Sequence, residues 1–409
     1  MKNPVQLFFV AAAAVFLATA CQNSKVYTVN ISGEGLDFYP DSSRMLVFSD
    51  HADFRYDKPV ADGYITDGRF SLSFQDSITR VYEMVVESDI LTGSFMTYSF
   101  FSDREPLHFT FSEKYGTPRA EVTGSSDNEE LYLYRNKSAE TYEAVDSMSY
   151  ELTKWRVSKY GEGGYPEEGT EDYAFMLAAF NSMNEMHARI TEESGYDKWL
   201  DDRIRNHKSL AGLQKVCSKL NSSIQMMNLI GQATVDQVSL KLYYEYRELY
   251  PDSWLVQQTD AALATIESLK PGMPAPDFSA PALDGERYSL SELIEGRIAV
   301  LDCWASWCRP CREHSIELIP LYEEYKDKGF TVVGVAREYD SLDDMRHAIE
   351  SDGYPWIQLY DLDGAEGIWN LYGLSTGGGG IFLIDSDGRI VEKVNDIASV
   401  KAYLQQHLD

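Results

Sequence analysis

Residues 300–312 read Val-Leu-Asp-Cys-Trp-Ala-Ser-Trp-Cys-Arg-Pro-Cys-Arg. The apolar start of this stretch predicts a buried strand, and the residues from Cys308 onward predict a helix. Cys308 therefore stands at a helix N-terminus, where unpaired backbone N–H groups and the helix dipole favour a thiolate over a thiol. Because only the thiolate attacks a disulfide, we expect Cys308 to be the nucleophile of a dithiol site.

Three nearby residues complete the predicted dithiol site. Cys311 lies one helical turn after Cys308, so we expect it to resolve a mixed disulfide and to lie nearer the protein interior. Arg309 adds a positive charge close to the nucleophile. Pro310 suits the first turn of a helix, because its missing N–H would be unpaired there in any case.

Asp302 stands six residues before Cys308, within the apolar strand. A carboxyl in such surroundings should have a raised pKa, which a general base working near neutral pH requires. The alternative is an Asp that only faces solvent at a strand edge. Because side chains alternate along a strand, Cys303 should point to the opposite face as a buried, inert thiol. Cys217, inside a helical segment, is also expected to be packed and inert.

The stretch 300–312 closely resembles the active-site stretch of thioredoxin-like proteins. The Pro-rich linker 270–276 and the residues 277–290 after it resemble the entry of the TlpA/ResA-like thioredoxin family, where a hairpin precedes the core. The following pattern predicts a βαβ unit, a β-hairpin and a closing helix, which is the thioredoxin arrangement. The resemblance implies an α/β thioredoxin fold over residues 270–409 and a thiol-disulfide oxidoreductase, and we expect no cofactor.

The resemblance also implies roles for side chains around the cysteines. Trp304 and Trp307 match the two family tryptophans that flank the site, shield it and offer a flat surface to a client. Asp302 matches the buried acid that helps to move the proton of the resolving Cys. His314 stands where exported relatives carry a Glu, and it could share a helix face with Cys311 and tune that thiol. A solvated surface His is the alternative.

Gly379 is the main departure from the family, whose cis-proline occupies this position. In the family that proline packs against the cysteine pair, sets backbone groups for pairing with a client strand, and discourages metal binding. The glycine run 377–380 instead predicts a mobile loop without such a wall. A metal site of Cys308, Cys311 and His314 is therefore an alternative, but structural zinc normally takes four ligands, so we expect no metal.

The N-terminus carries features of an export signal. Lys2 and the apolar run 5–20 predict a signal peptide over residues 1–20, because the run is too short for a stable membrane span. The small residues before Cys21 resemble the bacterial lipoprotein signal, in which this Cys is acylated and becomes the mature N-terminus. We therefore expect a periplasmic, membrane-anchored lipoprotein in the cell envelope of a Gram-negative bacterium. An ordinary cleaved signal with an incidental Cys is the alternative.

The remaining sequence predicts a multidomain chain. Residues 21–125 show short alternating runs between Gly-bearing turns, which predict an antiparallel β-sandwich or small barrel. Their layout, with Asp-Gly-Arg-Phe at 67–70, loosely resembles the β-rich domain of unknown function found ahead of thioredoxin modules in exported Bacteroidetes proteins. Residues 126–269 have helical periodicity, including a single helix expected over 196–220, and residues 270–409 form the thioredoxin-like domain.

The formal net charge of −29 narrows the possible partners. This charge argues against nucleic acid as a partner, because binding to its phosphates requires clustered Lys and Arg. It also argues against electrostatic binding to anionic lipid. We expect exported protein clients with cysteines or disulfides and a membrane electron donor of the thiol-reducing type. The alternative from another class is a tethered binding protein with a degenerate thioredoxin-like docking module. A thiol peroxidase is disfavoured, because Ala305 fills the Thr position of the peroxidase nucleophile motif.

Overall fold

The structure is a computed structural model that describes residues 26–409 apart from 51, 53, 55–56, 93–95, 231–234 and 375–377. The predicted signal peptide over 1–20 and the predicted lipidation site Cys21 therefore lie outside the described residues. The chain divides into two compact units. One lies within Met1–Lys215 and Glu245–Leu255, and the other within Val216–Tyr244 and Val256–Asp409.

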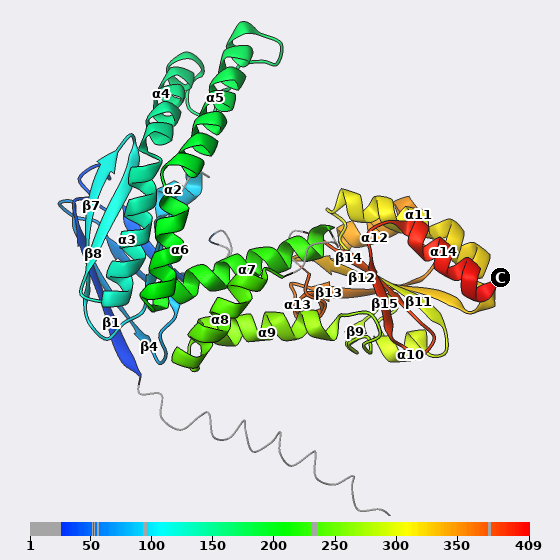
Figure 1. Ribbon diagram of the computed structural model, residues 1–409. Coiled ribbons are helices and arrows are strands. Elements are labelled where there is room, and N and C mark those ends of the chain that lie inside the picture. The colour runs from blue at the N-terminus through cyan, green and yellow to red at the C-terminus, as the bar shows by residue number, and fades with distance from the viewer. Residues whose placement is uncertain are drawn as a thin grey trace, which may run out of the picture. The chain divides into compact units, whose positions relative to one another are not determined.

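The first unit contains two four-stranded sheets, in the orders β4-β1-β7-β8 and β3-β2-β5-β6 (Figure 1). Their strands are β1 (Tyr27–Glu34), β2 (Arg44–Ser49), β3 (Ala61–Tyr64), β4 (Phe70–Asp76), β5 (Val81–Val86), β6 (Tyr98–Phe101), β7 (Leu107–Lys114) and β8 (Thr117–Thr123). Aromatic side chains of the two sheets meet: the ring of Tyr98 lies 5.1 Å from that of Phe111, and Phe100 lies 6.3 Å from Phe109. These contacts join the sheets in one core.

One strand pair departs from the predicted antiparallel arrangement. β1 pairs in parallel with β7, with Ile31 opposite Leu107. The chain between these two strands forms all of the second sheet, and so long a connection can bring it back in the same direction. The expectation of a purely antiparallel architecture was therefore wrong for this pair. The assignment to a sandwich or barrel stays a prediction.

One short helix of the first unit lies between β5 and β6, and the others follow the strands. They are α2 (Glu87–Thr92), α3 (Ser126–Thr141), α4 (Glu143–Tyr160), α5 (Glu171–Glu193) and α6 (Tyr196–Asn206). The single helix predicted over 196–220 is wrong, because α6 ends and α7 (Leu210–Ile230) begins after a break. His207 has extended backbone angles at this break, and the Leu210 N–H donates to the Asp127 carboxylate over 2.8 Å.

The helical residues do not form a compact unit of their own. α7 and α8 (Gln237–Leu249) each contribute residues to both units, and α9 (Trp254–Ser268) lies mainly in the second. α3 packs along β8 in the first unit (Figure 1). Helical periodicity identifies the helices but does not say what each one packs against, so the division at 125, 269 and 270 stays a prediction.

Residues from Ser279 to Asp409 form a five-stranded sheet with its covering helices and a short preceding hairpin. The elements are β9 (Ser279–Pro281), β10 (Arg287–Ser289), α10 (Leu290–Ile294), β11 (Ile298–Trp304), α11 (Arg309–Tyr325), β12 (Phe330–Glu338), α12 (Asp343–Asp352), β13 (Ile357–Leu362), α13 (Ile368–Leu371), β14 (Gly380–Ile384), β15 (Ile390–Val394) and α14 (Ile397–Leu408). The strand order is β13-β12-β11-β14-β15. β11, β12 and β13 are parallel to one another, β14 is antiparallel to β11, and β15 is antiparallel to β14. The predicted thioredoxin-like fold is confirmed here.

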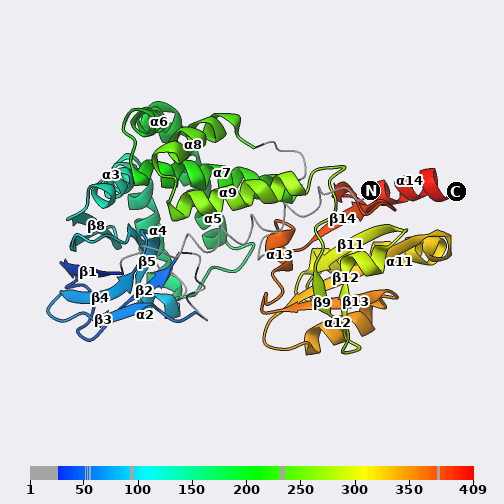
Figure 2. The same ribbon diagram turned by 90° about the horizontal axis from the view of Figure 1, so that it is seen from below.

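β11 lies at the centre of this sheet, and all of its residues are buried because helices cover both faces (Figure 2). Val300 and Trp304 belong to the core beneath α11, α12 and α14. Leu301 and Cys303 belong to the core beneath α10 and α13. This alternation sets the face on which each functional side chain of β11 lies.

Candidate redox-active site

A disulfide joins Cys308 and Cys311, whose Cα atoms lie 5.3 Å apart. Cys308 is the N-cap residue of α11, and Pro310 lies in the first turn of that helix. The predicted junction of strand and helix is thus confirmed. When the bond is reduced, the unpaired N–H groups of this turn and the helix dipole favour a thiolate at Cys308.

The burial of the two cysteines differs from the expectation. Cys308 exposes only 9% of its surface, whereas Cys311 is half-buried and packs against the core beneath α11. The Cys308 N–H donates to the carbonyl of Ala305 over 3.1 Å, and Ala305 is itself buried, which draws Cys308 inward. The expectation that Cys311 lies deeper was therefore wrong. Position on the helix, rather than depth, distinguishes the two thiols.

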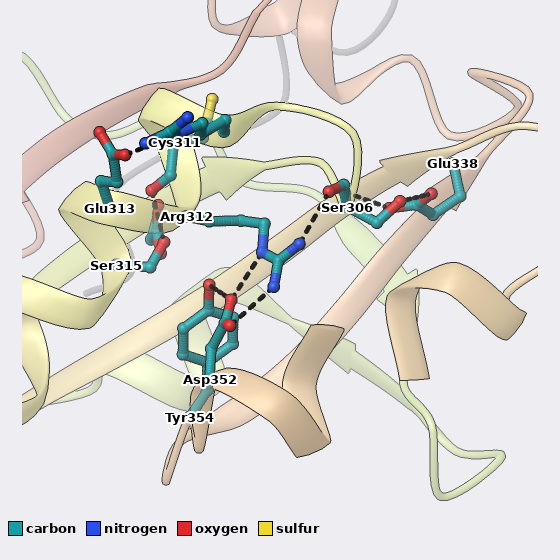
Figure 3. A network of polar contacts seen from close by, with 10 residues as sticks. Ser306, Cys311, Arg312, Glu313, Ser315, Glu338, Asp352 and Tyr354 are labelled. Carbon is teal, nitrogen blue, oxygen red and sulfur yellow. Dashed lines mark hydrogen bonds and ion pairs between the residues drawn. The ribbon is translucent and has the colours of Figure 1, made fainter. Parts of the chain in front are cut away.

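Two carboxylates fix the segments on either side of the cysteine pair (Figure 3). Glu338, at the end of β12, accepts hydrogen bonds from the N–H and the hydroxyl of Ser306 at 2.8 and 2.7 Å. Arg312 donates to both oxygens of Asp352 at 2.6 and 2.7 Å, and the Tyr354 hydroxyl donates to the same carboxylate. Burial raises the pKa of Glu338, and the hydrogen bond from Arg312 lowers the pKa of Asp352. The loop and the first turn of α11 are thus tied to two other elements.

Asp302 is buried beneath α11, with 1% of its surface exposed. The alternative of an Asp at a solvent-facing strand edge is therefore wrong. Burial raises the pKa of this carboxyl to about 7, and a hydrogen bond from Ser315 partly opposes that rise. A carboxyl with this pKa can both accept and release a proton near neutral pH.

Ser315 connects Asp302 with the helical turn that carries Cys311. Its hydroxyl oxygen lies 2.7 Å from Oδ2 of Asp302 and 3.0 Å from the carbonyl oxygen of Cys311. A hydroxyl has one hydrogen, so Ser315 donates to one of these oxygens at a time. Ser315 is not among the site residues that the sequence predicts. Its position four residues after Cys311 would have placed it on the same helix face.

The two tryptophans of the active-site stretch lie in different surroundings. Trp304 is fully buried, and its Nε1–H donates to Oε1 of Gln358 over 2.9 Å, so it cannot offer a surface to a client as expected. Trp307 is 46% exposed and stacks on Tyr339, which is 47% exposed, with ring centroids 6.3 Å apart. The exposed aromatic surface next to Cys308 therefore consists of Trp307 and Tyr339.

Gly379 lies directly against the cysteine pair. A Cβ atom at this position would lie 1.9 Å from the carbonyl oxygen of Cys303 and 3.2 Å from Sγ of Cys311. Its neighbour Gly378 accepts a hydrogen bond from Nε1–H of Trp369 over 2.8 Å. These contacts hold residues 378 and 379, for which a mobile loop was expected. The close approach explains why a glycine is needed here.

The other candidate side chains are accounted for by local contacts. Arg309 is exposed and pairs with Glu313 at 2.9 Å, so part of its charge is neutralised. His314 is exposed on α11. Cys303 and Cys217 are buried as expected, and burial raises the pKa of the Cys303 thiol and raises that of Cys217 to about 11. Within the described part of the chain, no group of three or more His, Cys, Asp or Glu side chains is placed to hold a metal ion.

Asp302→Asn should change how stability depends on pH. The raised pKa keeps Asp302 protonated in the folded state up to about pH 7, whereas it ionises near pH 4 in the unfolded chain. Because the folded state then binds more protons, the free energy of unfolding should fall as the pH rises between about pH 4 and about pH 7. Asp302→Asn removes this fall. In urea unfolding, the free energy of unfolding of the variant should therefore rise relative to that of the wild type between about pH 4 and about pH 7. The relative rise should be a few kcal/mol, at about 1.4 kcal/mol per pKa unit.

Two further variants sharpen this measurement. Ser315→Ala removes the hydrogen bond that lowers the pKa of Asp302, so the fall in stability should extend to higher pH. Asp361→Asn is the matched control, because Asp361 is also buried but accepts hydrogen bonds from the N–H groups of Glu366 and Ile368. That variant should lose stability, because an amide has one oxygen to accept the two N–H groups that the carboxylate oxygens now accept. Parallel curves for the wild type and Asp302→Asn would contradict the role of Asp302.

Known proteins resemble the chain in the region of this site. The AhpC/TSA family model matches residues 271–393. The thiol-disulfide oxidoreductase ResA of Bacillus anthracis is 30% identical over 134 residues, which are 32% of this chain and 73% of that protein. The thiol:disulfide interchange protein DsbE of Allochromatium vinosum is 32% identical over 123 residues, covering 29% of this chain and 64% of that protein.

Among solved structures, the thioredoxin domain of a thiol-disulfide oxidoreductase from Bacteroides vulgatus is 29% identical, with a TM-score of 0.32. The match covers 35% of this chain and 100% of that one. The region that the family model matches, residues 271–393, contains the disulfide, the buried acid and the thioredoxin-like sheet. By these relatives and by its Cys308–Cys311 pair, the chain belongs to the family of ResA-like thiol-disulfide oxidoreductases.

Proposed function

We propose that this chain exchanges disulfides with exported proteins through Cys308 and Cys311. In the reduced enzyme, the Cys308 thiolate attacks one sulfur of a client disulfide. A bond forms between Cys308 and that sulfur, the client disulfide breaks, and the second client sulfur leaves as a thiolate that takes up a proton. The product of this step is a mixed disulfide.

The second step resolves the mixed disulfide. Cys311 loses its proton, and its thiolate attacks Sγ of Cys308, which releases the remaining client sulfur as a thiolate. The client is then reduced by two electrons, and the enzyme holds the Cys308–Cys311 disulfide of this structure. A dithiol donor of the membrane supplies two electrons and two protons to start the next cycle. With a pKa near 7, Asp302 is suited to accept the Cys311 proton, and Ser315 positions it beside that turn.

The disulfide at the N-terminus of α11 is the observation that carries this proposal. Two other features support it. The stacked, exposed rings of Trp307 and Tyr339 form a flat aromatic surface next to Cys308 that suits an apolar client segment. The backbone at Gly379 has no side chain between it and Cys311, so a client strand could approach the disulfide closely there.

We propose further that the enzyme is a periplasmic lipoprotein, anchored through lipid on Cys21. The support for this is the sequence of residues 1–21. In the described ranges, no helix is both long and apolar enough to cross a membrane. Residues 21–125 as a β-sandwich or small barrel and 126–269 as a helical region complete the proposed organisation.

Trapping of mixed disulfides with Cys311→Ser in the cell envelope tests the proposed function. This variant keeps the attacking thiol but cannot resolve the intermediate, so exported proteins with cysteines should accumulate in covalent complexes that dithiothreitol releases. Cys308→Ser/Cys311→Ser is the control and should trap nothing. Equal trapping by both variants, or complexes with cytoplasmic proteins alone, would contradict the proposal.

The second candidate function is a tethered binding protein whose thioredoxin-like domain only docks a partner. Gly379, in place of the family proline, is the observation that favours it. The two functions differ in the pKa of the reduced Cys308 thiol. The ultraviolet absorbance of the thiolate, followed as a function of pH, measures that pKa. An enzyme needs a value below the free-thiol value of about 8.5, and a docking module does not. A value above it would favour the second candidate.

A further inference from the structure

The first unit contains a cavity of about 420 Å³ that shares no residue with the cysteine site. Its wall is formed by β6, β8, α3 and α6, together with single residues of α4 and α7. Sites for small molecules in proteins usually have volumes of about 300 to 1,000 Å³. The cavity is thus large enough for a ligand of the size of a substituted aromatic ring.

Tyrosines form a large part of this wall, and we call it the tyrosine-lined cavity. The five are Tyr98, Tyr132, Tyr134, Tyr142 and Tyr196. Their rings offer apolar faces that suit a planar ligand. The hydroxyls of Tyr98 and Tyr132 are buried without a hydrogen-bond partner, and each such group costs about 1–3 kcal/mol. Because these two hydroxyls have almost no accessible surface, the apolar ring faces of the wall, and not these hydroxyls, are what the cavity offers to a ligand.

Positive charge also gathers at the cavity, although the chain as a whole has a formal net charge of −29. Arg119 and Arg135 line it, and among the described lining residues Asp146 is the acidic one. Arg119 and Asp146 approach each other only to 3.5 Å. The described lining thus holds two guanidinium groups, Arg119 and Arg135, against one carboxylate, and this excess of positive charge favours an anionic ligand.

Arg135 is positioned as an anion-binding group. Its guanidinium lies over the rings of Tyr98 and Tyr132, at 5.8 and 5.4 Å from their centroids. One nitrogen donates to the carbonyl of Thr97 over 2.8 Å. A guanidinium has five N–H donors in a planar fork that matches a carboxylate. The tyrosine faces and the carbonyl fix the orientation of Arg135 and leave further donors for a ligand.

We propose that the tyrosine-lined cavity binds a small aromatic carboxylate. The carboxylate lies at Arg135 and Arg119, where charge-assisted hydrogen bonds hold it. The aromatic ring lies against the tyrosine faces. This binding site is separate from disulfide exchange and does not depend on that chemistry.

A binding titration of the full chain tests the proposal. The probes are benzoate, 4-hydroxybenzoate and indole-3-carboxylate, each compared with its neutral amide by ligand-detected NMR. At least one acid should bind, with its amide weaker by about tenfold or more, because the amide lacks the charge that Arg135 and Arg119 recognise. Inorganic phosphate, which has the charge but no ring, should bind more weakly than that acid.

Variants locate the bound acid. Arg135→Gln and Arg119→Gln should each weaken its binding by about tenfold. Arg104→Gln is the matched control, because Arg104 also lies over a tyrosine ring, that of Tyr27, but does not line the cavity. If circular dichroism shows that Arg135→Gln does not fold, the binding of the acid to Arg119→Gln tests the proposal.

Several results would overturn the proposal. They are no binding of any of the three acids at about 10 mM, a concentration that would detect even very weak sites, equal binding of acid and amide, and phosphate binding as tight as that of the acid. An equal loss of binding in Arg104→Gln and Arg119→Gln would also overturn it, because the charge effect would then not belong to the cavity.

Discussion

Cys308→Ser should abolish the dithiothreitol-dependent reduction of insulin by this chain, with a loss of about a thousandfold or more. A serine hydroxyl does not ionise at the N-terminus of α11, so no nucleophile remains to attack a disulfide. Cys311 cannot replace it, because it lies inside the first turn of α11 and not at the N-cap position, which faces the unpaired N–H groups of that turn. The rate of insulin precipitation at fixed dithiothreitol concentration measures the effect.

Cys303→Ala is the matched control for this loss. Cys303 is also a cysteine of the active-site stretch, but it is buried on the other face of β11 and burial raises the pKa of its thiol. Its substitution should leave the rate within about twofold, since it removes little more than a small buried apolar group. Unchanged activity in Cys308→Ser, or an equal loss in Cys303→Ala, would show that the cysteine pair does not carry the reaction.

Gly379→Ala should lower both the stability and the activity of the chain. The added Cβ would lie 1.9 Å from the Cys303 carbonyl oxygen, which is backbone and cannot turn away, so the loop or β11 must move. Overpacking of this kind typically costs about 1–3 kcal/mol in the free energy of unfolding. The same atom would press on Sγ of Cys311, and misplacing a reacting sulfur should slow disulfide exchange by about tenfold or more.

Gly378→Ala is the control within the same loop. A Cβ at Gly378 meets no atom within 4 Å, so this variant should keep its stability within about 0.5 kcal/mol and its full activity. Urea unfolding and the insulin assay compare the two variants. Equal effects at the two positions would mean that the close contact with the cysteine pair is not what requires glycine at 379.

Much of the fold could be predicted from local sequence patterns. The strands β11 and β12 and the helix α11 are long periodic segments, and they form the βαβ unit that the sequence predicts, with the helix beginning next to Cys308. The break between α6 and α7 could not be predicted in this way. It depends on a hydrogen bond from Leu210 to Asp127, a residue far away in the sequence. The parallel pairing of β1 with β7 is non-local for the same reason.

The candidate site also contains residues that are close in the sequence and residues that only the fold brings together. Cys308, Cys311 and Asp302 lie in one stretch of thirteen residues. The local structure of this stretch, a strand followed by a helix, is therefore enough to bring them to the junction of β11 and α11. Tyr339 and Glu338 reach the site from the end of β12, and that contact arises only when the sheet forms. No local pattern marks these two residues as neighbours of the cysteines.

The sequence by itself determined the thioredoxin-like fold, the cysteine pair and the buried acid, because each follows from a strand that runs directly into a helix. Only the tertiary structure decided which tryptophan is exposed, how the loop before the cysteines is fixed, and why Gly379 tolerates no side chain. Those properties come from contacts between segments distant in the chain. Their geometry is set by packing across the sheet rather than by the order of neighbouring residues.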